Sequence, residues 1–116
     1  MDKCYPGFYR LRKSWEYKLV REVGCKFYTP HFVLLVSENS EKNDRLGITV
    51  SRKVGNAVER NRLKRIIREF FRNNRHRYPN FRDYSVIAKR NSAHLSSSNI
   101  FFELNNGFLK TAIRND

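Results

Sequence analysis

Apolar residues in the middle of the chain recur at helical spacing. They fall at i, i+3, i+4, i+7 and i+8 and form one stripe: Leu63, Ile66, Ile67, Phe70 and Phe71. Gly55 and Asn56 interrupt the preceding extended run, and Asn56 suits an N-cap with Glu59 completing a capping box. We therefore predict a helix from about Ala57 to Arg75 that packs its stripe on a core.

Three other segments have strand-like patterns. Leu46 to Arg52 alternates between apolar and polar side chains, which is typical of a half-buried strand. Phe27 to Val36 is predicted as a mostly buried strand, with Pro30 at an edge or a bulge. Tyr84 to Lys89 is predicted as a further strand.

Two more helices complete the predicted order. One runs from about Ser14 to Val23 and stops at Gly24, and Ser96 caps a last helix that ends near Ile113. Residues 1–12 are expected to be an irregular basic segment. The order α-β-β-α-β-α predicts an α+β two-layer sandwich, with a mixed sheet of three to four strands and about three helices. We expect residues 1–116 to form a single domain.

Positive charge is concentrated on the central helix. The net charge of the chain is +13, and Arg52 to Arg77 contains ten lysines and arginines against two glutamates. At about 100° per residue, four polar side chains gather opposite the apolar stripe: Asn61, Arg65, Arg68 and Arg72. Solvated helix faces usually mix charges of both signs, whereas this face repeats one sign. The pattern favours binding to a polyanion.

Several other classes of site are disfavoured by the sequence. No apolar run approaches the roughly 20 residues of a membrane span, and the start lacks the apolar region of a signal peptide, so we expect a cytoplasmic protein without a membrane partner. Two cysteines, Cys4 and Cys25, suggest reduced thiols. The scattered histidines and unpaired carboxylates predict no catalytic residue, no protein metal site and no small-molecule substrate.

The basic segment resembles a known family signature. Arg60-Asn61-Arg62, within Gly55-Asn56-Ala57-Val58 through Arg68-Glu69, is similar to the "RNR" motif of the protein subunit of bacterial ribonuclease P. The resemblance extends over nearly the whole chain, because the flanking segments also match in order: Arg10–Lys13, Phe32–Leu34, Leu46–Lys53 and Tyr84–Lys89.

This resemblance implies a fold and a function. The family fold has an unusual left-handed β-α-β crossover through the basic helix, against the right-handed rule. The family acts as a ribonucleoprotein endoribonuclease, in which the RNA subunit carries the active site and Mg²⁺. The implied partners are ribonuclease P RNA and precursor tRNA, whose 5′ leader is removed to give the mature 5′ end.

The resemblance also implies two groups of site residues. The RNA-binding group matches the motif: Arg52, Lys53, Asn56, Arg60, Asn61, Arg62, Lys64, Arg65 and Arg68. The leader-binding group is expected in a cleft between the first helix and the open sheet face: Tyr17, Arg21, Phe32 and Ser51. Arg60 and Asn61 are alternatively braces within the fold, and Tyr17 and Phe32 are alternatively core residues. Arg21 and Leu35 depart from the family pattern, because many relatives carry an aromatic residue at the position of Arg21 and a tyrosine can occur at that of Leu35.

Two other functions compete with this interpretation. Small basic α+β domains are common among ribosomal proteins, which bind RNA without any catalytic RNA partner. A self-sufficient protein nuclease would cleave without RNA, but it would need the carboxylate or histidine cluster that the sequence lacks. The long motif in its sequence context favours ribonuclease P over both.

Overall fold

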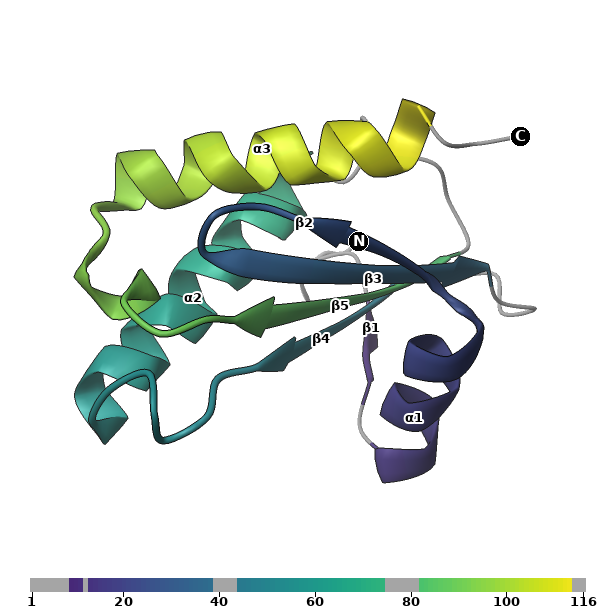
Figure 1. The fold of residues 1–116 in the computed structure, drawn as a ribbon, viewed down its shortest axis with the longest axis horizontal. Coiled ribbons are helices and arrows are strands. Elements are labelled where there is room, and N and C mark those ends of the chain that lie inside the picture. The colour runs from purple at the N-terminus through teal and green to yellow at the C-terminus, as the bar shows by residue number, and fades with distance from the viewer. Residues whose placement is uncertain (1–8, 12, 39–43, 75–81, 114–116) are drawn as a thin grey trace.

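The structure is a computed structural model, and it describes residues 9–11, 13–38, 44–74 and 82–113. Three helices and a mixed sheet form an α+β fold, as predicted (Figure 1). In chain order the elements are β1 (Tyr9–Arg10), α1 (Ser14–Val23), β2 (Cys25–Tyr28), β3 (Phe32–Glu38), β4 (Arg45–Thr49), α2 (Ala57–Asn74), β5 (Arg82–Ala88), a single-turn 3-10 helix (Ser92–His94) and α3 (Ser97–Ile113).

The strands lie in the order β1-β4-β5-β3-β2. The two-residue strand β1 adds to an edge of the four longer strands, within a segment that we expected to be irregular. β4 is parallel to β1 and β5, whereas β3 is antiparallel to β2 and β5. The sheet is therefore mixed, with its parallel part around β4.

The prediction of one strand from Phe27 to Val36 is wrong, because this segment is a hairpin. β2 pairs antiparallel with β3, so that Phe27 lies opposite Leu34. The turn between them contains Pro30, which lacks an N–H for the strand ladder. The hydroxyl oxygen of Thr29 accepts a hydrogen bond from the Phe32 amide at 3.0 Å and closes the turn. Pro30 therefore lies in a turn between two strands, and not at a bulge within one strand.

The basic helix α2 connects the parallel strands β4 and β5. Its start is the predicted capping box: the Glu59 amide donates to Oδ1 of Asn56, and the Asn56 amide donates to Oε1 of Glu59, each at 2.9 Å. In Figure 1, α2 lies behind the sheet while β4 and β5 both point left, with β5 above β4. This arrangement gives the crossover the left-handed sense that the family resemblance implies.

Two apolar clusters hold the helices on opposite faces of the sheet. The larger cluster joins α2 and α3 to one face and contains the whole predicted stripe of α2: Leu63, Ile66, Ile67, Phe70 and Phe71. The smaller cluster places α1 on the other face through Leu11, Val20 and Leu35. Both flanking helices begin as predicted, and the Ser96 hydroxyl accepts from the Asn99 amide at the start of α3.

Candidate nucleic-acid interface

The outward face of α2 is polar and strongly basic. Asn61 and Arg65 are exposed, and Lys64 and Arg68 are partly buried. The turn before α2 adds two exposed cations, Arg52 and Lys53. Because the opposite face of the helix is buried in the core, these charges are held on one side of the molecule. The arrangement provides donors suited to phosphate oxygens.

Two residues of the motif also have structural roles at the start of α2. The amide oxygen of Asn56 is occupied by the helix cap. The Arg60 guanidinium is partly buried and donates through Nε to the carbonyl oxygen of Gly55 at 3.1 Å. The bracing alternative therefore fits Arg60 better than Asn61, whose side chain is exposed.

Arg62 links α2 to the segment that leads into α3. Its Nη2 donates to the carbonyl oxygen of Leu95 at 3.0 Å, and its Nη1 donates to that of Ala93 at 3.4 Å. These acceptors end the 3-10 turn, so the guanidinium fixes the path of the chain there. No sequence pattern indicated this role, because backbone carbonyls leave no trace in residue identity.

The face of the sheet that carries α1 is organised in two rows of side chains. One row crosses β2, β3, β5 and β4 and contains Lys26, Leu35, Ser85 and Gly47. Its last three members are buried. The second row, which we call the open row, contains Tyr28, Val33, Ile87 and Thr49. Val33 and Ile87 are only partly buried, and Tyr28 and Thr49 are exposed, so this row faces outward beside α1.

Tyr17 lies between α1 and β4, at the border of these two rows. Its ring packs on Gly47, where an added Cβ would lie 2.7 Å from Cζ of Tyr17. The Tyr17 hydroxyl donates to the carbonyl oxygen of Leu11 at 3.2 Å. The side chain is partly buried and clusters with Val33 and Ile87. Tyr17 therefore packs on the smaller apolar cluster, in line with the core alternative, but the residue is not fully buried.

The expectation that Phe32 contacts the leader is wrong, because the structure supports the alternative that Phe32 is a core residue. Its side chain has no exposed surface and belongs to the core beneath α2 and α3, on the opposite face from Tyr17. The period of two along β3 sends Phe32 and Val33 to different faces, so Val33 is the residue that reaches the α1 side. Arg21 and Ser51 are exposed. Leu35 is buried beneath α1 and cannot replace an aromatic contact.

Tyr28 and Lys89 are candidate contacts that the sequence interpretation missed. Tyr28 is 58% exposed, and Nζ of Lys89 lies 5.6 Å from the centre of its ring. The same Nζ donates to the carbonyl oxygen of Thr29 at 2.9 Å, which holds the cation near the ring. Recognising Tyr28 required the β2–β3 hairpin, because a single long strand gave it no special position.

Arg45 of β4 links α1 to β5 of the sheet. Its guanidinium donates to both carboxylate oxygens of Asp83 at 2.8 Å and to Oε2 of Glu16 at 2.7 Å. The Asp83 side chain is only 3% exposed, so the arginine compensates a buried charge. This cluster positions α1, and with it Tyr17, beside the open row.

The described residues show no protein metal site. Within residues 9–11, 13–38, 44–74 and 82–113, no three histidine, cysteine, aspartate or glutamate side chains are grouped to hold an ion. His31 lies in the β2–β3 turn rather than within a strand, and His94 is exposed in the 3-10 turn. Cys25 is an exposed free thiol. Cys4, His76 and Arg75 lie outside the described residues.

No helix in the described part of the chain has the length and apolar content needed to cross a membrane.

The model of the Ribonuclease P family matches residues 5–112. The chain belongs to the ribonuclease P protein family. The ribonuclease P protein component of Syntrophus aciditrophicus is 44% identical over 95 residues, which cover 82% of this chain and 80% of that protein. That of Geotalea uraniireducens is 39% identical over 103 residues, 89% of this chain and 90% of its own length.

Solved structures of ribonuclease P proteins share the fold. The Staphylococcus aureus protein superimposes with a TM-score of 0.81 at 33% identity, covering 90% of this chain and 94% of that one. The Thermotoga maritima protein gives 0.79 at 32% identity, covering 87% and 96%. Family membership gives the chain a role in the ribonuclease P enzyme and in tRNA processing, and it implies an RNA partner.

Proposed function

We propose that this chain binds the catalytic RNA of ribonuclease P through the outer face of α2. The observation that best supports this proposal is the separation of the helix into a buried apolar stripe and an exposed basic face. Arg65 and Arg68 supply guanidinium groups that suit bidentate phosphate contacts. Arg52 and Lys53 extend the same surface toward β4. Neutralising RNA phosphates at this surface releases counterions and makes binding depend on salt.

The α1 side of the sheet is the proposed contact for the 5′ leader of precursor tRNA. Tyr17 and Tyr28 provide aromatic rings, and Arg21 and Lys89 provide cations on the same side of the sheet. A basic surface with aromatic side chains is suited to single-stranded RNA, with each stacked base contributing about 1–3 kcal/mol. Tyr28 compensates for the aromatic residues absent at Arg21 and Leu35. Ser51 borders the surface beyond β4.

In this proposal, the RNA subunit performs the hydrolysis. We place Mg²⁺ mainly on the RNA subunit and the substrate, as the family resemblance implies. The protein reduces repulsion between two polyanions and favours precursor over mature tRNA. It supplies binding energy and position, and no proton transfer is assigned to its side chains.

A cleavage assay tests this function. A 5′-extended precursor tRNA is incubated at low Mg²⁺ with ribonuclease P RNA, with the protein, or with both. We expect cleavage at the mature 5′ end only when both are present. Cleavage by protein alone would indicate a self-sufficient nuclease. A folded protein that binds RNA but stimulates none of several ribonuclease P RNAs would contradict the proposal in favour of another RNA-binding role.

The leader contact is tested separately with Tyr17→Ala and Tyr28→Ala. Each variant is expected to lose about 5- to 100-fold in affinity for precursor tRNA bound to the holoenzyme, with little change for mature tRNA. Tyr28→Phe is the matched control, because it keeps the ring beside Lys89. Equal losses for precursor and mature tRNA would show that these rings do not contact the leader.

A further inference from the structure

A pocket of about 580 Å³ lies between α3 and the β2–β3 turn, outside the two surfaces assigned above. The turn supplies one wall through Thr29, Pro30 and His31, and Leu95 lines the end nearest the start of α3. The helix supplies the other wall through residues that share one side: Asn99, Phe102, Glu103, Asn106, Leu109 and Lys110. This volume is within the usual range of small-ligand sites.

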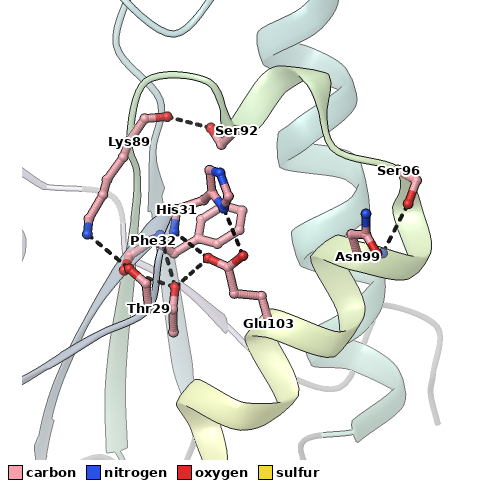
Figure 2. Close-up of polar contacts among 8 residues, drawn as sticks. All are labelled: Thr29, His31, Phe32, Lys89, Ser92, Ser96, Asn99 and Glu103. Carbon is pink, nitrogen blue, oxygen red and sulfur yellow. Dashed lines mark hydrogen bonds and ion pairs between the residues drawn. The ribbon is translucent and has the colours of Figure 1, made fainter.

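A hydrogen-bonded link between the two walls holds the pocket in shape (Figure 2). Oε2 of Glu103 accepts from the Thr29 hydroxyl at 2.7 Å and from the His31 amide, and Oε1 lies 3.0 Å from Nδ1 of His31. Lys89 donates to the Thr29 carbonyl oxygen from the other side of the turn. The turn is therefore tied both to α3 and to the residue that follows β5, and the Glu103 carboxylate accepts hydrogen bonds from the turn.

The exposed groups of the pocket suit a planar, hydrogen-bonding ligand. Phe102 is 70% exposed, although it is one of the largest apolar side chains of α3. Asn99 and Asn106 stand on the same side of the helix, one turn before and one turn after it. An amide both donates and accepts, as the edge of a nucleobase does, and an aromatic ring stacks on the face of a base. Lys110 adds a cation beside Leu109.

The position of the pocket connects it to the basic helix. The side chain of Leu95 lines the pocket, while its carbonyl oxygen accepts the hydrogen bond from Arg62 of α2. The pocket therefore meets the first half of α2 at Leu95. The protein carries a net charge of +13, and its family membership implies an RNA partner.

We infer that this pocket receives one unpaired RNA base, stacked on Phe102 and hydrogen-bonded by Asn99 or Asn106. The inference rests on the proposed function, because it extends the RNA contact of α2 to α3. The base belongs either to the ribonuclease P RNA or to precursor tRNA, since both present the same chemistry. Stacking supplies the affinity, and the link through Glu103 keeps the turn wall in place.

Affinity measurements on the assembled enzyme test the inference. Phe102→Ala should weaken binding to one of the two RNAs by about 5- to 100-fold, whereas Phe102→Trp should retain it because the stacking face remains. If the variant binds ribonuclease P RNA more weakly, but the holoenzyme binds precursor tRNA normally, the base comes from ribonuclease P RNA. A loss only in the binding of precursor tRNA to the holoenzyme identifies the substrate. Ser98→Ala is the control for an exposed change on α3 outside the pocket.

Photocrosslinking separates failure of this inference from failure of the proposed function. A benzophenone amino acid is placed at position 102 in one sample and at position 64, on α2, in another. We expect position 102 to crosslink to a single-stranded nucleotide. RNA crosslinks from position 64 but none from position 102, with Phe102→Ala binding normally, would overturn the pocket alone. A crosslink from position 102 to a second protein copy would overturn it in favour of self-association. Absence of RNA crosslinks at both positions would contradict the function of α2 as well.

Discussion

The helices α2 and α3 pack on the same face of the sheet and are nearly equal in length, at 18 and 17 residues, yet their outward faces differ in kind. α2 presents arginines and lysines, whereas α3 presents serines, asparagines, Phe102 and Leu109. Their buried sides are equivalent: Leu63 and Ile67 of α2 have no exposed surface, and neither have Ile100 and Leu104 of α3.

The comparison separates what forms the fold from what selects a partner. Burial of apolar side chains determines where both helices lie, and any sufficiently polar outer face satisfies that requirement. The repeated positive charge on α2 is therefore unnecessary for packing and costs some repulsion. The outward face of α3 carries Lys110 among mostly uncharged side chains, so it avoids most of that cost, and it exposes the aromatic side chain of Phe102.

The largest expected effect tests whether the inward faces are equivalent. Leu63→Ala in α2 and Leu104→Ala in α3 each remove a fully buried side chain, and each should lower the free energy of unfolding by about 2–5 kcal/mol. Urea unfolding followed by circular dichroism measures both. Val58→Ala, at a position that is 77% exposed, is the control and should change stability by less than about 0.5 kcal/mol. A loss confined to one helix would break the comparison.

The second prediction concerns the outward face of α2. Arg65→Ala combined with Arg68→Ala should weaken binding to ribonuclease P RNA by about 10- to 100-fold. The slope of log K against log salt concentration should also decrease by the amount that corresponds to about two phosphate contacts. Unfolding should change by less than about 1 kcal/mol, because the apolar stripe is intact. Lys18→Ala with Lys26→Ala removes the same charge from exposed positions outside α2. Equal losses for the two pairs would mean that net charge, and not the helix face, determines affinity.

Arg62 tests the boundary between the inward and outward roles. Arg62→Ala should lower the free energy of unfolding by about 1–3 kcal/mol, because two carbonyl oxygens lose a charged donor. Arg62→Lys keeps the charge but cannot reproduce both bonds, so it should recover RNA affinity more than stability. If Arg62→Ala weakens RNA binding and leaves thermal unfolding unchanged, Arg62 acts as an RNA contact and not as a brace.

The caps of the two helices should respond alike. Asn56→Ala at α2 and Ser96→Ala at α3 each remove an acceptor for a first-turn amide, at a cost of about 1 kcal/mol. Asn56→Asp is a useful comparison, because aspartate also caps a helix. Denaturant midpoints for the three variants provide the measurement. A selective effect of Asn56→Asp on RNA affinity, with stability retained, would assign Asn56 a phosphate contact beyond its cap.

The smallest expected effect is a pH dependence at α3. Burial opposes ionisation of Glu103, but hydrogen bonds from Thr29 and His31 outweigh it and lower the pKa of the carboxyl group below its ordinary value of 4.5. Its stabilising contribution is therefore complete above pH 4.5 and is lost as the pH falls through the lowered pKa. Glu103→Gln should reduce this loss of stability in acid. Parallel stability curves for both proteins between pH 6 and 3 would contradict it.

The sequence predicted local features well where the signal itself is local. The stripe of α2 and the capping box of Asn56 and Glu59 are both encoded within a few residues, and the structure confirms them. The ends of α1 and the cap of Ser96 follow the same rule. The left-handed crossover came only from the family resemblance, because general packing rules favour the opposite hand.

The sequence was less informative where contacts are distant or depend on strand parity. Phe32 and Val33 are both apolar neighbours, and only the observed hairpin register shows which one faces α1. Arg62 looked like its neighbours in the motif until its carbonyl partners were known. The link from Glu103 to Thr29 joins residues 74 positions apart, which no spacing rule addresses.

The clamp formed by Arg45 has a mechanical consequence. One guanidinium holds Glu16 of α1 and Asp83 of β5, and β5 is the strand that follows the basic helix. The Arg45 cluster therefore joins α1 to the strand that follows α2, in addition to the apolar contacts of Val20 and Leu35. If the two proposed surfaces bind RNA, this link makes the distance between the two bound RNAs a property of the protein fold, within a body of 35 × 32 × 27 Å.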